Sequence, residues 1–150
     1  HESGLIGEMY GKSPSNIVPS LALAANGDIP YFRVLGSGYN TPDGTGIRDY
    51  IHITDLANGH VMAIKKLYSQ PNVYTYNLGT GRGYSVLETI KAFEKASGRE
   101  IPYKIEAARD GDIAEMYACS DKAREELGWT AKYGIEDICR SAWNWHNKIY

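Results

Sequence analysis

The chain has 150 residues, with 16 basic and 18 acidic side chains and a formal net charge of −2. A chain of this length suits one compact domain. The balanced charge and the absence of a basic tract exclude an electrostatic nucleic-acid surface. No apolar run reaches the roughly 18 residues that a membrane span needs. Two cysteines, Cys119 and Cys139, are too few for a disulfide scaffold, so we expect a reducing compartment, the cytoplasm.

The first third of the chain predicts a helix and two strands. Ser15 or Asn16 is a candidate N-cap and Gly27 a candidate stop for a helix over 15–27. A strand over 31–36 follows. The segment 41–46 contains a proline and an Asp-Gly pair, which favour a turn. Alternation from Ile47 to Ile53 then predicts a second strand. Arg48 lies near the start of this strand, at the exit of the loop.

The rest of the chain continues to alternate between helices and strands. Thr54 or Asp55 is expected to cap a helix running to 68, whose apolar positions Ala57, Val61, Ile64 and Tyr68 recur at helical spacing. The later expected elements are a strand over 73–79, a helix over 85–98 with the capping box Ser85 and Glu88, a strand over 101–107, and helices over 120–128 and 134–150. This order predicts an α/β fold with a small, partly parallel sheet and flanking helices.

Most candidate motifs favour a structural interpretation. Gly79, Gly81 and Gly83 read G-x-G-x-G, which misplaces the third glycine of a dinucleotide loop, so a tight turn before a helix is favoured. The four histidines show no metal-ligand spacing. The cysteines lack partners that would indicate a nucleophile. No tyrosine is followed four residues later by lysine, so the Tyr/Lys pair of short-chain dehydrogenases is absent from this chain.

Two arginines at loop boundaries are the strongest candidates for ligand binding. Arg48 lies at the exit of the glycine-containing loop, and Arg109 precedes Asp112 in a second loop. Guanidinium groups match the geometry of phosphate oxygens, and two of them together suit a dianion such as a diphosphate. Asp112 would accept hydrogen bonds from neutral hydroxyl groups. Taken alone, an arginine beside a Gly-Asp pair is equally typical of a solvated turn.

Three segments together resemble a known family. "DGTGIRDYIHITDLANGH", "YNLGTGRGYSVLE" and "RDGDIAEMYACSDKAREELGW" are similar, in order and spacing, to the C-terminal portion of the UDP-glucose 4-epimerases (UDP-galactose 4-epimerases). These are NAD-dependent members of the extended short-chain dehydrogenase/reductase superfamily. The resemblance runs along the whole chain and implies galactose metabolism, with UDP-glucose and UDP-galactose as substrates.

The resemblance implies a role for each position that matches a binding residue of the family. Arg48 and Arg109 would bind the diphosphate, and Asp112 would hold the ribose hydroxyls. Backbone groups of Arg33, Val34 and Leu35 would contact the uracil.

Three further positions would lie against the substrate on the same basis. Asn16 and Ile17, at the start of the first helix, would touch it, and Met116 would lie beside the sugar. Family members differ at this last position, and methionine there leaves open whether N-acetylated UDP-sugars are accepted.

The resemblance also implies what this chain does not contain. The GxxGxxG cofactor loop, the Tyr-x-x-x-Lys pair and the catalytic Ser or Thr belong to the family's N-terminal half, a Rossmann domain that would bind NAD. We therefore expect residues 1–150 to form a UDP-sugar-binding lobe that is inactive alone, monomeric alone, and part of a homodimer in the intact enzyme. The alternatives are a freestanding nucleotide-sugar-binding module, and the equivalent lobe of a related dehydratase or decarboxylase.

Overall fold

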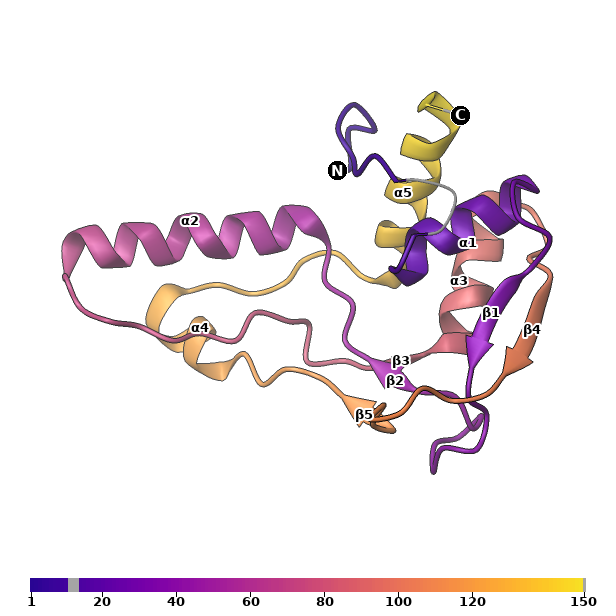
Figure 1. Cartoon of the computed structure of the whole chain (residues 1–150). Coiled ribbons are helices and arrows are strands. Elements are labelled where there is room, and N and C mark those ends of the chain that lie inside the picture. The colour runs from indigo at the N-terminus through magenta and orange to yellow at the C-terminus, as the bar shows by residue number, and fades with distance from the viewer. Residues whose placement is uncertain (11–13, 150) are drawn as a thin grey trace.

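The computed structural model describes residues 1–10 and 14–149. The elements in chain order are α1 (Ile17–Asn26), β1 (Phe32–Leu35), β2 (Ile47–Arg48), α2 (Ile53–Ser69), β3 (Tyr84–Ser85), α3 (Val86–Ser97), β4 (Tyr103–Glu106), β5 (Glu115–Met116), α4 (Asp121–Leu127) and α5 (Ile135–Ile149). Figure 1 shows two regions. We call α1, β1, α3, β4 and α5 the body, and α2, the connection 70–83 and α4 the arm.

The strands form two small sheets, which confirms the predicted α/β class with partly parallel pairing. In the body, β1 pairs with β4 in parallel, with Phe32 opposite Tyr103. In the second sheet β2 is central, antiparallel to β3 and parallel to β5. This second sheet lies where the arm meets the body (Figure 1).

The hydrophobic core lies in the body, between its three helices and β1. Leu21 of α1, Val34 of β1, Phe93 of α3 and Cys139 of α5 are completely buried there. The predicted capping box starts α3: the Ser85 hydroxyl accepts from the Glu88 amide at 3.0 Å, and the Glu88 carboxylate accepts from the Ser85 amide at 2.8 Å. Such a cap is worth about 1 kcal/mol.

Two predictions about the arm are wrong. The strand expected over 47–53 ends at Arg48, and α2 begins at Ile53 with His52, rather than Thr54 or Asp55, as its N-cap. The imidazole Nδ1 of His52 accepts from the Thr54 amide at 3.1 Å. An imidazole nitrogen can replace the usual side-chain oxygen because it too offers a lone pair to the free amides of the first turn.

The strand predicted over 73–79 is also not formed among the described residues. Its exposure alternates as in a strand, with Tyr74, Tyr76 and Leu78 half-buried and the intervening residues exposed. No backbone–backbone hydrogen bond of the described chain involves residues 74–78. Because a strand requires a neighbouring strand to satisfy its amides and carbonyls, the pattern alone does not produce one.

The apolar stripe predicted on α2 is exposed. Val61, Ile64 and Tyr68 keep 48%, 52% and 86% of their surface in solvent. The helix instead buries Asp55 and Gly59. The missing side chain of Gly59 permits close contact, since a Cβ there would lie 2.6 Å from a methyl carbon of Leu78. Across the described residues, the longest apolar helical stretch falls short of what a bilayer-spanning helix requires.

Candidate functional site

The candidate site is built on the second sheet, at the end of β2. The loop before β2 is closed by Asp43, whose carboxylate accepts from the amide of buried Thr45 at 2.9 Å and from its hydroxyl at 2.7 Å. Gly44 has a φ of 80°, which favours glycine. The Arg48 guanidinium donates from Nη1 to the carbonyl of Ile47 at 2.8 Å, so its direction is fixed by its own strand.

Arg48 and Arg109 converge on one carboxylate. Arg109 donates to Asp112 through Nε at 2.9 Å and Nη2 at 3.2 Å. Nη2 of Arg48 also lies 3.8 Å from Oδ1 of Asp112. The Asp112 side chain is 23% exposed, that of Arg48 26% and that of Arg109 65%. The structure therefore brings together two residues 61 positions apart, around an anion that is part of the chain.

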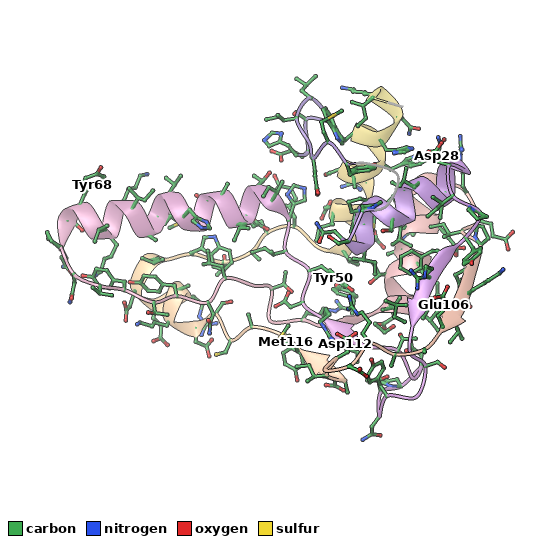
Figure 2. All side chains as sticks on the ribbon, viewed as in Figure 1. Asp28, Tyr50, Tyr68, Glu106, Asp112 and Met116 are labelled. Carbon is green, nitrogen blue, oxygen red and sulfur yellow. The ribbon has the colours of Figure 1, made fainter. Side chains whose placement is uncertain are left out.

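Met116 completes this cluster because β5 pairs with β2. Met116 lies opposite Arg48 in the parallel register, and its side chain is largely exposed. Figure 2 shows Met116 and Asp112 close together beside the second sheet. Four of the predicted site residues, Arg48, Arg109, Asp112 and Met116, thus share one exposed face of the molecule.

The other five predicted site residues lie in the body. Asn16 is the N-cap of α1 but makes no side-chain cap hydrogen bond, so its amide is not used by the helix. Ile17 packs partly against the core. No hydrogen bond or ion pair of the described residues joins either side chain to the Arg48 cluster.

β1 provides the predicted uracil-contacting residues. Val34 is buried, and the Arg33 side chain turns away to Glu106, with Nη2 at 2.7 Å from its carboxylate. The hydrogen bond from Arg33 lowers the pKa of Glu106. Within the part of the chain that the structure describes, β4 is the strand paired with β1, and β1 has no second strand neighbour. Among the described residues, its other edge is therefore not paired with a strand.

Asp49, which no sequence motif indicated as a site residue, organises the glycine-rich turn. Its Oδ1 accepts from the amide and hydroxyl of Thr80 at 3.0 and 2.5 Å, and its Oδ2 from the Gly81 amide at 2.9 Å. Gly81 has a φ of 72°, as a turn of this kind needs. Amides that would hold phosphates in a dinucleotide loop are here bound to the chain's own carboxylate, which supports the structural interpretation of this turn.

Asp49 belongs to a set of three aspartates that could have been noticed in the sequence. Asp43, Asp49 and Asp55 recur every six residues within one stretch, and each accepts hydrogen bonds from a different loop. Asp55 is buried and accepts from the amides of Lys132 and Tyr133 at 2.8 and 2.9 Å. Carboxylates that accept backbone amides in this way fix loops that have no regular structure.

The two buried histidines contact side chains that belong to the fold. His52 lies between Ser141, with Nε2 and Oγ 3.1 Å apart, and the ring of Tyr133. His146 contacts the Tyr10 hydroxyl through Nδ1 at 2.8 Å. Burial lowers the pKa of both imidazoles. Within residues 1–10 and 14–149, no three His, Cys, Asp or Glu side chains are grouped as a metal site requires.

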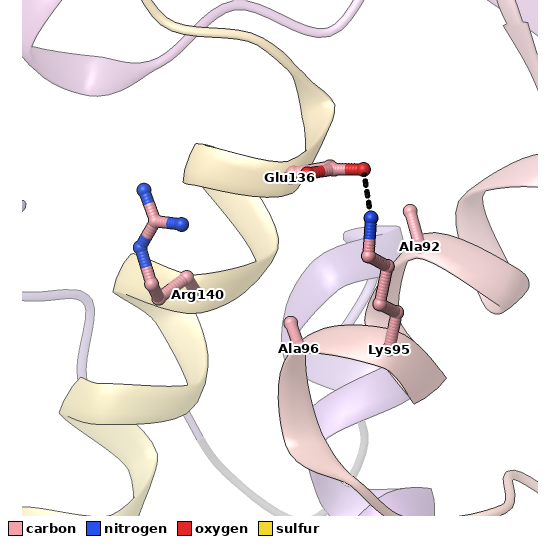
Figure 3. Close-up of a pocket in the computed structure, with 5 residues that line it drawn as sticks. All are labelled: Ala92, Lys95, Ala96, Glu136 and Arg140. Carbon is pink, nitrogen blue, oxygen red and sulfur yellow. Dashed lines mark hydrogen bonds and ion pairs between the residues drawn. The ribbon is translucent and has the colours of Figure 1, made fainter.

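A shallow pocket between α3 and α5 lies apart from these residues. Ala92, Lys95 and Ala96 line one side, and Glu136 and Arg140 the other (Figure 3). Its charges are already paired, since Lys95 donates to Glu136 at 2.7 Å and Arg140 is bonded to Asp137. The pocket has no group directed at a ligand and is not part of the candidate site.

Comparison with known families supports the resemblance inferred from the motifs. Residues 1–142 match the model of the GDP-mannose 4,6 dehydratase family. The chain belongs to this family. Among curated proteins, it is 53% identical over 150 residues to UDP-glucose 4-epimerase 3 of Oryza sativa, and 50% identical over 147 residues to the UDP-glucose 4-epimerase of Bacillus subtilis. The predicted relationship to the UDP-glucose 4-epimerases of the extended short-chain dehydrogenase/reductase superfamily is confirmed.

Solved structures show the same relationship in three dimensions. The UDP-glucose 4-epimerase of Bifidobacterium longum, in complex with NAD⁺ and UDP, superimposes with a TM-score of 0.94 at 53% identity. The enzyme of Stenotrophomonas maltophila, with bound NAD and formylated UDP-arabinopyranose, gives a TM-score of 0.96 at 47% identity. Each match covers 99% of this chain but only 44% of the other. For the rice and Bacillus relatives the corresponding shares are 40% and 43%.

Proposed function

We propose that this chain is the UDP-sugar-binding lobe of a UDP-glucose 4-epimerase. The observation that carries the proposal is the convergence of Arg48 and Arg109 on Asp112. Two guanidinium groups that contact one carboxylate provide a position where a diphosphate can replace it. Charge-assisted contacts of this kind are worth about 1.5–3 kcal/mol each.

In this proposal Asp112 changes partners when the ligand binds. The diphosphate takes over the hydrogen bonds of Arg109 and the ion pair of Arg48 that are now directed at the carboxylate. The released carboxylate accepts hydrogen bonds from the ribose hydroxyls, as predicted from the motif. This exchange avoids leaving a partly buried charge unpaired in either state, which would be unfavourable.

The remaining predicted residues bind the two ends of the ligand. The open edge of β1, at Arg33 to Leu35, offers backbone groups to the uracil. The unused amide of Asn16, with Ile17 beside it, contacts the substrate from α1. Met116, opposite Arg48, lies against the sugar. Because methionine is flexible, N-acetylated and plain UDP-sugars are both candidate ligands.

The residues of this chain do not fit an NAD site. The amides of its glycine-rich turn are bound to Asp49. NAD, which both solved relatives contain, would therefore be held by the part of the relatives that this chain does not cover. There it would accept hydride from the sugar and return it. This chain contributes substrate binding and orientation, and we expect no turnover of UDP-galactose with NAD⁺ alone.

The arm supplies the face on which that other half docks. Val61, Ile64 and Tyr68 form an exposed apolar stripe along α2, and Figure 2 shows Tyr68 at the far end of the arm. Beside it, residues 74–78 carry strand-like alternation without backbone partners among the described residues. An apolar helix face next to an unpaired strand is typical of a surface completed by another sheet. The occupant we propose is the portion of the relatives, more than half of their length, that this chain does not cover.

Titration with UDP and UDP-glucose tests the binding assignment. Arg48→Ala and Arg109→Ala should each weaken binding about tenfold, which corresponds to about 1.4 kcal/mol. Arg140→Ala is the matched control, because Arg140 also pairs with an aspartate three residues away but lies on α5, outside the site. Equal affinities for wild type and all three variants would remove the assignment.

Coexpression of this chain with the portion of a relative that it does not cover tests the proposed docking of the other half onto the arm. The complex should form and turn over UDP-galactose, and Ile64→Glu should prevent both without unfolding this chain. Failure of the two parts to form a complex would favour the freestanding binding module. A product other than the 4-epimer would favour a dehydratase or decarboxylase. In this proposal the lobe alone is monomeric and cytoplasmic, and the intact enzyme is a homodimer.

A further inference from the structure

We propose that Asp49 is a positioning residue that sets the spacing between Arg48 and Met116, and thereby the preference among UDP-sugars. The inference rests on the proposed function, because it concerns the same ligand. It assigns a role in that site to a residue that makes no direct contact with the ligand and that the family resemblance did not include.

Asp49 holds β5 at two points on either side of Tyr117. Its backbone amide donates to the carbonyl of Met116 at 3.1 Å, and its Oδ2 accepts from the amide of Ala118 at 3.3 Å. One residue, directly after the end of β2, therefore fixes the backbone both at and beyond the position beside the sugar. Because β5 has only two residues, its regular pairing is too short to do this by itself.

The same carboxylate holds the glycine-rich turn against β5. Thr80 and Gly81 donate three hydrogen bonds to it, at 2.5 to 3.0 Å. The approach is so close that a Cβ at Gly79 would lie 2.5 Å from both Asp49 Oδ2 and the Ala118 Cβ. Asp49 thus joins three segments that are far apart in the sequence, and both of its oxygens are in use.

The position of Asp49 connects this network to the ligand. It follows Arg48 directly, and Arg48 is opposite Met116 in the register. If β5 moves relative to β2, the distance between the phosphate-binding guanidinium and the side chain beside the sugar changes. A shift of this kind alters the fit of the sugar more than the binding of the diphosphate, because in the proposed site the sugar lies against Met116 on β5, whereas Arg48 on β2 binds the diphosphate.

Asp49→Asn tests the network with little change in volume. The amide keeps one acceptor oxygen, but its NH₂ group would face the N–H donors of Gly81 and Ala118, so two of the present hydrogen bonds are lost. Thr80→Ala is a milder variant, which removes the hydroxyl donor at 2.5 Å and leaves the Thr80 amide.

Asp55→Asn is the matched control. Asp55 is also an aspartate that accepts two backbone amides and fixes a loop, but that loop is at Lys132 and Tyr133, away from the sugar position. Both substitutions are expected to lower the melting temperature. Only the change at Asp49 should alter the preference among ligands.

The measurement is calorimetric titration of the 150-residue chain with UDP, UDP-glucose and UDP-N-acetylglucosamine. Asp49→Asn should change the ratio of the two sugar-nucleotide affinities by about threefold or more, against less than twofold for UDP itself, as expected when a packing contact at the sugar changes by less than one hydrogen bond. Thr80→Ala should change the ratio in the same direction, and Asp55→Asn should leave it at the wild-type value.

The outcomes separate this inference from the proposed function. If the wild type binds but Asp49→Asn and Asp55→Asn give the same ratio, Asp49 is only structural and the inference is overturned. If the wild type binds none of the three ligands, the proposed function fails and the inference with it. Should Asp49→Asn not fold, the ratio measured for Thr80→Ala decides: an unchanged value rejects the role of Asp49.

Discussion

Similar sequence patterns are buried in the body but exposed in the arm. In the body, apolar residues at helical spacing, such as Leu21 and Phe93, are fully buried by neighbouring elements of the same chain. In the arm, Ile64 and Tyr68 follow an equally regular helical spacing and remain exposed. The spacing of a helix therefore shows which residues share a face, but not whether this chain covers that face.

The physical reason is whether another element of the chain is present to cover the apolar face. Burial of apolar surface stabilises a fold by about 25 cal/mol per Å² only when another element removes that surface from water. Three helices and a strand meet in the body, whereas the exposed face of α2 has no neighbour among the described residues. The contrast indicates that the body is a self-sufficient unit and the arm an incomplete one.

The largest expected effect comes from truncating a core residue of the body, in contrast to an exposed residue of the arm. Phe93→Ala removes a fully buried ring from the body and should lower the free energy of unfolding by about 3–5 kcal/mol. Ile64→Ala, at a half-exposed position of the arm, should change it by no more than about 0.5 kcal/mol. Urea unfolding followed by circular dichroism measures both. Similar losses for the two variants would mean that the arm has its own core, and the distinction would be lost.

A smaller effect is expected from acidification, because each region contains one buried histidine. Burial lowers the pKa of His146 in the body and of His52 at the start of the arm below the usual value near 6.5. Between the folded and unfolded pKa values the unfolded chain binds more protons, so the free energy of unfolding falls as the pH decreases below about 6.5. The carboxylates with lowered pKa values act only at more acidic pH.

Denaturation curves at pH 7 and pH 5 measure this effect. The single variants His52→Asn and His146→Asn should each reduce the difference between the two pH values. His60→Gln is the control, because His60 is exposed on α2. A pH dependence that persists unchanged in both buried-site variants would show that neither imidazole is responsible.

The smallest expected effect is a difference in the rates at which the two thiols react, which does not involve the stability of the fold. Cys139 is completely buried in the body, where burial raises its pKa to about 12, whereas Cys119 is exposed on the segment leading to α4. An aromatic disulfide reagent at pH 8 should modify Cys119 within minutes and Cys139 only at the rate at which the chain unfolds. Fast modification of both thiols, or of the single-cysteine variant that retains Cys139, would show that the body opens locally.

The sequence predicts the arginines of the site but not the hydrogen bonds that hold the site in place. The position of Arg48 and Arg109 at loop boundaries predicts a diphosphate site, because guanidinium groups suit a diphosphate, and their convergence on one carboxylate agrees with this prediction. Whether they bind it remains a prediction. Asp49 was overlooked because its hydrogen bonds reach residues 31 and 69 positions away. No local pattern in a single sequence reports contacts at such separations.

What the sequence alone determined is the set of features that depend on near neighbours. The capping box of α3 and the left-handed Gly27 and Gly98 that end α1 and α3 follow from residues within one or two turns. The tertiary structure decided whether a pattern acquires a partner. The strand-like residues 73–79 found no strand to pair with, and α2 begins at Ile53 with His52 as its N-cap. The pairing of β2 with β5, two strands of two residues each, brought Arg48, Asp112 and Met116 together. These outcomes depend on backbone groups and charges that only distant segments can supply.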